Sequence, residues 1–194
     1  MSDVLPAGAP QNRQPASAER TLYCALVPLS VVTSDKRALL LPNAVIAETF
    51  SYDRIEPLPD APQAVIGCVR YEGRSLPVLS IEALRGAPST PSSRSRVVIL
   101  HPLTIAEADM SGPEQSAFAL LASGYPHLVA VTPALLAECA LQDEDIACAA
   151  LARVRIGHTE ALIPDLDRLR ALAHGVPGPI PDTGPEITPA LAVL

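Results

Sequence analysis

Short extended segments, each ended by a turn signal, recur along this chain and limit the folds that it can adopt. Runs of β-branched and apolar residues alternate with Gly, Pro, Asn or Ser about every 8–12 residues, and the helical stretches between them are brief. This rhythm is typical of β-barrels and β-sandwiches. Because 48% of the 194 residues are hydrophobic, the chain can also form a buried core. We therefore expect a mainly β fold with short helices.

The clearest hairpin lies at residues 65–79. Residues 65–69 (VIGCV) and 74–79 (RSLPVL) favour extended structure, and Gly73 between them supplies the positive φ that a tight reversal needs. Pro77 cannot donate a hydrogen bond to a neighbouring strand, so we expect the second strand to have an edge at that point. The centre of this pattern holds no catalytic group.

The hairpin belongs to a pattern that occurs twice. Residues 65–85 contain a strand, a glycine turn, a strand with proline and a short helix, and residues 151–173 repeat this order with Gly157 in the turn. The repeat predicts two similar β-subdomains within residues 21–174. We expect residues 1–20 to be a disordered arm and residues 175–194 to be a proline-rich flexible tail.

The remaining segments give local predictions. Segment 43–50 fits either a strand or a short helical turn, and both interpretations stay open. We expect an acidic, solvated turn at residues 142–145. Strands are predicted at residues 22–29, 38–42, 97–100, 117–121, 128–131, 150–156 and 160–164.

Three helices are predicted from their capping residues. The first covers residues 80–85 and is closed by Gly86. The second covers residues 132–138, with the Thr132 hydroxyl as N-cap and proline at the first helical position. The last runs from residue 166 to 174, capped by Asp165, and ends at Gly175. Its apolar stripe consists of Leu166, Leu169 and Leu172.

Charge and composition argue against two classes of partner. The net charge of −7, an aromatic content of 3% and the lack of Trp disfavour nucleic-acid binding. No apolar run approaches the roughly 20 residues of a membrane helix, and no signal peptide is visible, so we expect a cytoplasmic protein without direct membrane insertion. The local basic residues Arg85, Arg94 and Arg96 lie in a Ser/Pro-rich segment and are expected to be solvated.

The residues that usually carry chemistry are scattered. Four cysteines show no zinc-binding spacing and are expected to be buried reduced thiols: Cys24, Cys68, Cys139 and Cys148. The four histidines form no motif, and the chain has neither a nucleophile elbow nor a phosphate-binding glycine loop. We therefore expect no catalytic residue, no metal and no cofactor.

Several ordered motifs together resemble the CheW-like domain family. The resemblance rests on these segments, in this order: IAE at residues 46–48, IEPLP at 55–59, PQAVIG at 62–67, GRSLPVLSI at 73–81 and ALIPDLDRL at 161–169. It covers roughly residues 21–174. The compact ending ALIPDLD also resembles the ChpC-type adaptors of pilus-linked chemosensory systems, which drive twitching motility through type IV pili.

The resemblance implies a fold and a function. CheW-like domains consist of two SH3-like five-stranded β-barrels and are not enzymes. They are scaffold proteins of bacterial chemotaxis signal transduction that couple the cytoplasmic tips of methyl-accepting chemoreceptors to the regulatory domain of a CheA-type histidine kinase, and they are recruited to membrane receptor arrays. We do not expect a CheV-like adaptor, which adds a phosphoreceiver domain, because the sequence leaves no room for one after residue 174.

The chain departs from the family pattern at the hairpin tip. Where the family has N-L-R-G, this chain has Arg70, Tyr71, Glu72 and Gly73, so that an acidic residue replaces the family arginine. A basic side chain stands two positions upstream, at Arg70, which strand alternation would place on the same face as position 72. The family aspartate after the second strand is Ser80 here.

The candidate partner-binding residues follow from the resemblance. Glu48 is either a partner contact or an ordinary surface carboxylate, and Tyr71 and Glu72 are either contacts or residues that tolerate a turn. Two other functions stay open: a small-molecule-binding β-barrel, which needs an apolar pocket, and a CheW-derived module recruited to a different partner. The full predicted set is Ile46, Glu48, Arg70, Tyr71, Glu72, Gly73 and Leu76.

Overall fold

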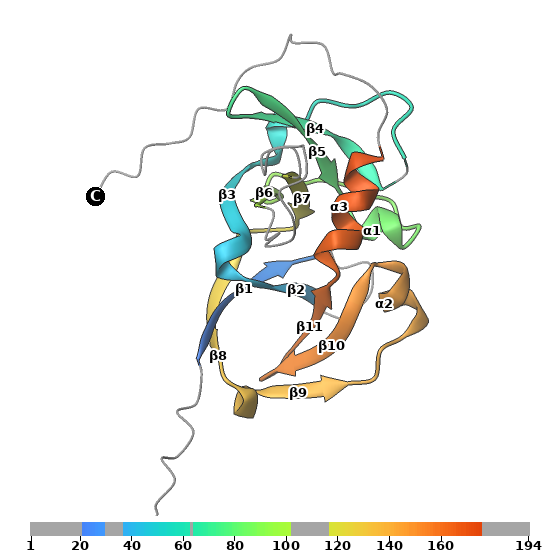
Figure 1. The fold of residues 1–194 in the computed structure, drawn as a ribbon. Helices are drawn as coiled ribbons and strands as arrows, with labels where there is room; N and C mark the ends of the chain where they lie inside the picture. Colours follow the sequence, from blue (N-terminus) through green and yellow to red (C-terminus); the bar gives the residue numbers. More distant parts are fainter. Residues whose placement is uncertain (1–20, 30–36, 63, 102–116, 176–194) are drawn as a thin grey trace, which may run out of the picture.

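The computed structural model describes residues 21–29, 37–62, 64–101 and 117–175, and in these ranges the chain forms two β-sheets (Figure 1). The middle sheet takes its strands from the middle of the chain, in the order β3-β6-β7-β5-β4. Its strands are β3 (Ile46–Ser51), β4 (Val65–Tyr71), β5 (Arg74–Leu79), β6 (Arg96–Leu100) and β7 (Phe118–Ala122). The predicted mainly β class is confirmed.

The terminal sheet combines strands from both ends of the described chain, in the order β8-β1-β2-β11-β10-β9. Its strands are β1 (Leu22–Pro28), β2 (Arg37–Pro42), β8 (His127–Val131), β9 (Leu136–Cys139), β10 (Ala150–Ile156) and β11 (Thr159–Pro164). All the predicted strands are present, with bounds that differ by a residue or two. In Figure 1 this sheet lies below the middle sheet.

A short 3-10 turn follows one edge strand of each sheet and leads the chain toward the opposite edge. In the terminal sheet, the two edge strands β8 and β9 follow each other in the chain and are separated by η4 (Pro133–Leu135). In the middle sheet, η2 (Tyr52–Arg54) follows the edge strand β3 and leads to Glu56, whose backbone N–H and carbonyl each bond Cys68 of the other edge strand at 2.8 Å. Two barrel-like subdomains result, as predicted, but the terminal sheet has six strands where five were expected.

The repeat predicted from the sequence is present in the structure. The hairpin β4–β5 is followed by α1 (Ile81–Leu84), and the hairpin β10–β11 is followed by α3 (Leu166–His174). In both copies the second hairpin strand continues the sheet in parallel, β5 with β7 and β11 with β2. The ladder between β5 and β7 begins at Val78, so Pro77 pairs only with β4 and the predicted edge at Pro77 is confirmed.

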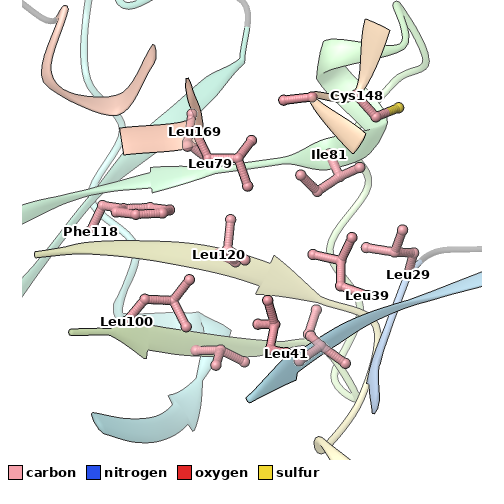
Figure 2. Close-up of a cluster of buried hydrophobic side chains, with 14 of the residues drawn as sticks. Leu29, Leu39, Leu41, Leu79, Ile81, Leu100, Phe118, Leu120, Cys148 and Leu169 are labelled. Atoms are coloured by element: carbon pink, nitrogen blue, oxygen red, sulfur yellow. The ribbon is translucent and has the colours of Figure 1, made fainter. Parts of the chain in front are cut away.

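Alternate residues of the central strands face two different cores. On β6, Val97 and Ile99 point into the middle sheet's own core, whereas Val98 and Leu100 face a larger cluster between the two sheets (Figure 2). Strand β7 divides its residues in the same way, and Leu120 faces the intersheet cluster. Strands buried on both faces need apolar residues at successive positions, which explains the uninterrupted runs VVIL and FALLA.

Helix α3 lies against the intersheet cluster. The Asp165 carboxylate accepts a 2.9 Å hydrogen bond from the Arg168 backbone N–H, which confirms the predicted cap. Leu169 is fully buried in the cluster and Leu166 is partly buried against it. The third member of the expected stripe, Leu172, is 36% exposed. In the last turn Ala173, which is fully buried in the same cluster, takes the place expected for Leu172.

The segment with two open interpretations contains both structures. Residues Asn43–Val45 form the 3-10 turn η1, and β3 begins immediately after it at Ile46. At α1, the Ser80 hydroxyl accepts a 3.2 Å bond from the Ala83 N–H, and Gly86 follows the helix with φ of 71°. The predicted closure by Gly86 is confirmed, whereas Ser80, expected inside the helix, is its N-cap.

Two local predictions are wrong. Only Pro133–Leu135 form a helical turn, the Thr132 side chain makes no capping bond, and Leu136 begins strand β9 because it can pair with β10. The acidic segment is not a solvated turn, because α2 (Asp143–Ala147) forms there and Asp145 is fully buried.

The thiols largely match the prediction. Cys24, Cys68 and Cys148 are buried and free, whereas Cys139 is half-buried. Across the described ranges, no helix has the length and apolar character to cross a membrane. The expected arm at residues 1–20 and all of the expected tail after Gly175 lie outside the described residues.

Candidate partner-binding surface

The tip of the β4–β5 hairpin is a two-residue turn. Tyr71 pairs with Arg74 across the strands, and the two residues between them, Glu72 and Gly73, have φ of 49° and 73°. Two successive positive φ values are those of a type I′ turn, which matches the twist of antiparallel strands. Gly73 adopts this conformation freely, but for Glu72 the left-handed region costs roughly 1–2 kcal/mol. The hairpin therefore presents a glutamate where the backbone prefers Gly, Asn or Asp.

Tyr71 of the hairpin packs on Phe50 of β3. The two ring centroids are 6.0 Å apart and the rings are tilted by 57°. An aromatic pair at this separation contributes about 0.5–1.5 kcal/mol beyond its buried area. Strands β3 and β4 are the opposite edges of the middle sheet, so the closure of the sheet brings these two rings together.

Two carboxylates flank the Tyr71 phenol. Its pKa is raised chiefly by burial, then by the negative charges of Glu72 and Glu48, and by a hydrogen bond between the phenol and the Glu72 side chain. The structure thus brings Glu48 and Glu72 into one electrostatic environment although 23 positions separate them in the chain. We call Glu48, Phe50, Tyr71 and Glu72 the hairpin surface.

A β-bulge determines which way Glu48 faces. The ladder between β3 and β6 shifts between Ile46 and Glu48, so Ile46 pairs with Leu100 and Glu48 pairs with Ile99. Paired residues of antiparallel strands share a face of the sheet. Ile46 accordingly packs toward the intersheet cluster, and Glu48 lies on the same face as Phe50. Without the bulge, Ile46 and Glu48 would lie on the same face of β3, because they are two positions apart.

Two other predicted residues, Arg70 and Leu76, belong to the hairpin strands and lie outside the hairpin surface. Arg70 is half-buried, pairs with Ser75, and extends from the face of β4 opposite to Tyr71. The expectation that Arg70 and position 72 share a face is wrong, because Glu72 lies in the left-handed turn and outside the strand. Leu76 is 4% exposed in the middle sheet's core, where it pairs with Val69, so its side chain is not available at the surface.

Sequence reasoning missed Phe50. The residue stands two positions after Glu48, and strand alternation applied to β3 would have placed the two on one face. The Tyr71 partner could not be found in the same way, since it depends on closure of the sheet.

The basic residues of the Ser/Pro-rich segment are not simply solvated. Arg85 forms a 2.6 Å ion pair with Glu144, and the Arg96 guanidinium lies 4.3 Å from the centre of the Tyr125 ring. Arg94 is exposed, as expected. The prediction was wrong for Arg85 and Arg96 because both have partners far away in the sequence.

The arrangement at the hairpin surface suits recognition of another molecule. Tilted rings offer apolar contact area at low cost in side-chain entropy, and the carboxylates beside them select the charge of what binds. The interior of the middle sheet behind the surface is filled by side chains, among them Val69, Val78 and Ile99. This filling leaves the alternative of a ligand held inside that barrel without support.

The chain was compared with known proteins. The family model of the CheW-like domain matches residues 29–170. The crystal structure of the scaffolding protein TtCheW from Thermoanaerobacter tengcongensis superimposes with a TM-score of 0.56 at 13% sequence identity, covering 75% of this chain and 90% of that one. No curated protein matches the chain. The family match covers well over half of the sequence, and the chain belongs to the family of CheW-like domains.

Proposed function

We propose that this chain is a non-enzymatic, cytoplasmic adaptor that couples chemoreceptors to a CheA-type histidine kinase. The hairpin surface is the observation that carries the proposal, because it combines an aromatic pair with two carboxylates, one on the turn and one on β3. The likeness in fold to a protein described as a scaffold is a second support.

Rigidity is the physical property that an adaptor requires of this surface. Val69 and Leu76 fill the sheet directly behind the hairpin, and the turn itself is restricted to positive φ values. A surface that is already ordered loses little conformational entropy when a partner binds. The hairpin and β3 are therefore suited to bind a partner without rearrangement.

The charge of the surface defines what the partner presents. Glu48 and Glu72 place negative charge near Tyr71, where both raise the pKa of the phenol. Opposite charges across an interface set its register and exclude wrong partners. We propose that the kinase regulatory domain or the receptor tip places a basic side chain here, in contrast to partners of family members that carry arginine at this turn.

The finer assignment that we propose is an adaptor of a pilus-linked chemosensory system, of the ChpC type. Its support is the ending ALIPDLD, which forms the end of β11 and the start of α3. Deletion of the gene should then reduce twitching motility and leave swimming unchanged. A defect in swimming alone would contradict this assignment without affecting the adaptor role.

Calorimetric titration of the full chain against the kinase regulatory domain, and separately against receptor tips, tests the adaptor role. We expect Glu48→Lys and Glu72→Arg each to weaken binding about tenfold, which is about 1.4 kcal/mol. Glu72→Arg should leave the melting temperature nearly unchanged, since substitutions of exposed residues usually cost within about 0.5 kcal/mol. Glu48 is half-buried, so the affinity of Glu48→Lys is compared at a temperature where thermal unfolding shows the variant to be folded.

Glu138→Lys is the matched control, because Glu138 is an exposed glutamate on β9 of the other sheet. Equal weakening by the control would indicate a nonspecific charge effect. Unchanged affinity in both hairpin variants would place the interface elsewhere. Failure of the unmodified chain to bind either molecule would indicate recruitment to a different partner.

A further inference from the structure

Helix α2 is held in place by charges and has no buried apolar side chain. Of its five residues only Asp145 is buried, while Ile146 is 48% exposed. The other helices differ, since α1 buries Ile81 and α3 buries Leu169. The position of α2 therefore depends on its ionic contacts.

Arginines from three separate elements provide these contacts. The buried Asp145 carboxylate lies 3.3 Å from Arg37 of β2 and 3.4 Å from Arg153 of β10. Glu144 is shared between Arg37 at 2.5 Å and Arg85 at 2.6 Å. Two neighbouring carboxylates of α2 thus meet three guanidinium groups.

The arginines belong to both halves of the fold. Arg37 and Arg153 are residues of the terminal sheet, and Arg85 directly follows α1 at the end of the β4–β5 unit of the middle sheet. Immediately after α2, Cys148 and Ala149 enter the intersheet cluster, where each is 1% exposed. Figure 2 shows Cys148 with Ile81 in this cluster. Helix α2 therefore covers the boundary between the two sheets, which we call the seam, next to the buried Cys148 thiol.

Ionic attachment of this kind gives low local stability. Partly exposed ion pairs contribute little free energy, and salt screens them. Segments with few buried apolar contacts open more readily than the strands of a core. The Glu144 side chain is 43% exposed, so its two ion pairs contribute little free energy, whereas the Asp145 contacts are buried.

We propose that residues 142–147 form a charged strap that opens and closes over the seam while both sheets stay folded. The carboxylate of Glu144, with Arg37 and Arg85, sets the balance between the two states. Opening exposes Cys148 and the adjoining edge of the intersheet cluster. A molecule that competes for Arg85 or Glu144 would shift the strap toward its open state.

Alkylation of the full chain by iodoacetamide, followed by peptide mass spectrometry, measures this opening. Cys148 and Cys68 are each 1% exposed, but only Cys148 lies under the strap. Burial raises the pKa of Cys148 to about 11, so the closed state reacts slowly. We expect Cys148 to react at least about tenfold faster than Cys68. Equal rates would show that both react only through global unfolding and would overturn the proposal.

The variant Glu144→Gln tests whether the charge of Glu144 keeps the strap closed. It should speed alkylation of Cys148 about threefold to tenfold without changing Cys68. About 1 M salt should also speed alkylation of Cys148 in the unmodified chain, and its effect on the variant should be smaller. Asp167→Asn is the control, because it removes an exposed ion pair with Arg170 on α3. Unchanged Cys148 reactivity in Glu144→Gln, or an equal increase at Cys68, would overturn the strap.

Discussion

Gly67 lies so close to Glu56 that a Cβ atom on Gly67 would come within 2.3 Å of the Glu56 carbonyl oxygen. This approach is where the edges of the middle sheet meet, next to the paired hydrogen bonds between Glu56 and Cys68. Gly67 also has φ of 152°, a conformation that side chains disfavour. Gly67, which lies in the predicted strand VIGCV, is therefore required by the backbone for closure of the middle sheet.

Gly67→Ala should lower the free energy of unfolding by about 3 kcal/mol or more, since backbone strain and a clash with backbone atoms add. Gly157→Ala is the control, because Gly157 has φ of 59° but a Cβ atom there would meet no described atom within 4 Å beyond its chain neighbours. It should cost only about 1 kcal/mol. Urea unfolding of both variants checks this, and equal losses would contradict the steric explanation.

Ser80→Ala should cost about 1–2 kcal/mol, because the Ser80 hydroxyl accepts from the Ala83 N–H and donates to Glu82 at 2.9 Å. Ser80→Asp, which restores the family residue, should also destabilise the fold, since it places a second carboxylate beside buried Glu82. The double variant Ser80→Asp with Glu82→Gln should recover most of this loss. Thermal unfolding of the three variants tests the set, and a stable single Ser80→Asp variant would refute it.

Leu169→Ala should lower the free energy of unfolding by about 2–5 kcal/mol, because Leu169 is fully buried between the sheets. Leu172→Ala on the same helix removes the same atoms from a position that is 36% exposed. It should cost less than about 1 kcal/mol. Chemical denaturation measures the free energy of unfolding of both variants. Similar losses would mean that α3 packs through both leucines.

Alkaline pH should destabilise the protein partly through Tyr71. Its pKa is raised in the folded state by burial first and then by Glu72 and Glu48, so folding favours the protonated phenol. This contribution is complete below the unfolded-state pKa of about 10 and is lost as the pH rises through the folded-state pKa. Tyr71→Phe should remove that part of the pH dependence, as measured by unfolding at several pH values. A titration of Tyr71 by NMR that gave an unshifted pKa would exclude the effect.

Much of the fold could be predicted because its signals are local. The hairpin turns, the glycine that closes α1, the cap at Asp165 and the apolar runs depend on neighbouring residues, and the structure has them where they were expected. Segment 132–138 failed for a different reason. Its proline and threonine favour a helix start, but pairing with β10 draws Leu136 into a strand.

The candidate site was less predictable than the fold. Glu48, Tyr71 and Glu72 were identified through a family resemblance, but their proximity depends on sheet closure between edges that the sequence does not mark. Asp145 was interpreted as solvated because nothing near it in the chain supplies a cation. Its partners Arg37 and Arg153 come from two separate strands, and only the tertiary structure brings them together.

The mixed origin of the terminal sheet has a consequence for synthesis on the ribosome. Every strand of the middle sheet lies between Ile46 and Ala122, so that sheet can form as soon as this stretch has emerged. Strand β2 emerges earlier but must wait for β11, its parallel neighbour, to be translated. During that interval residues 37–39 have no partner strand on that side. The strands of the nascent chain that are translated first are therefore the most exposed to aggregation and the most in need of a chaperone.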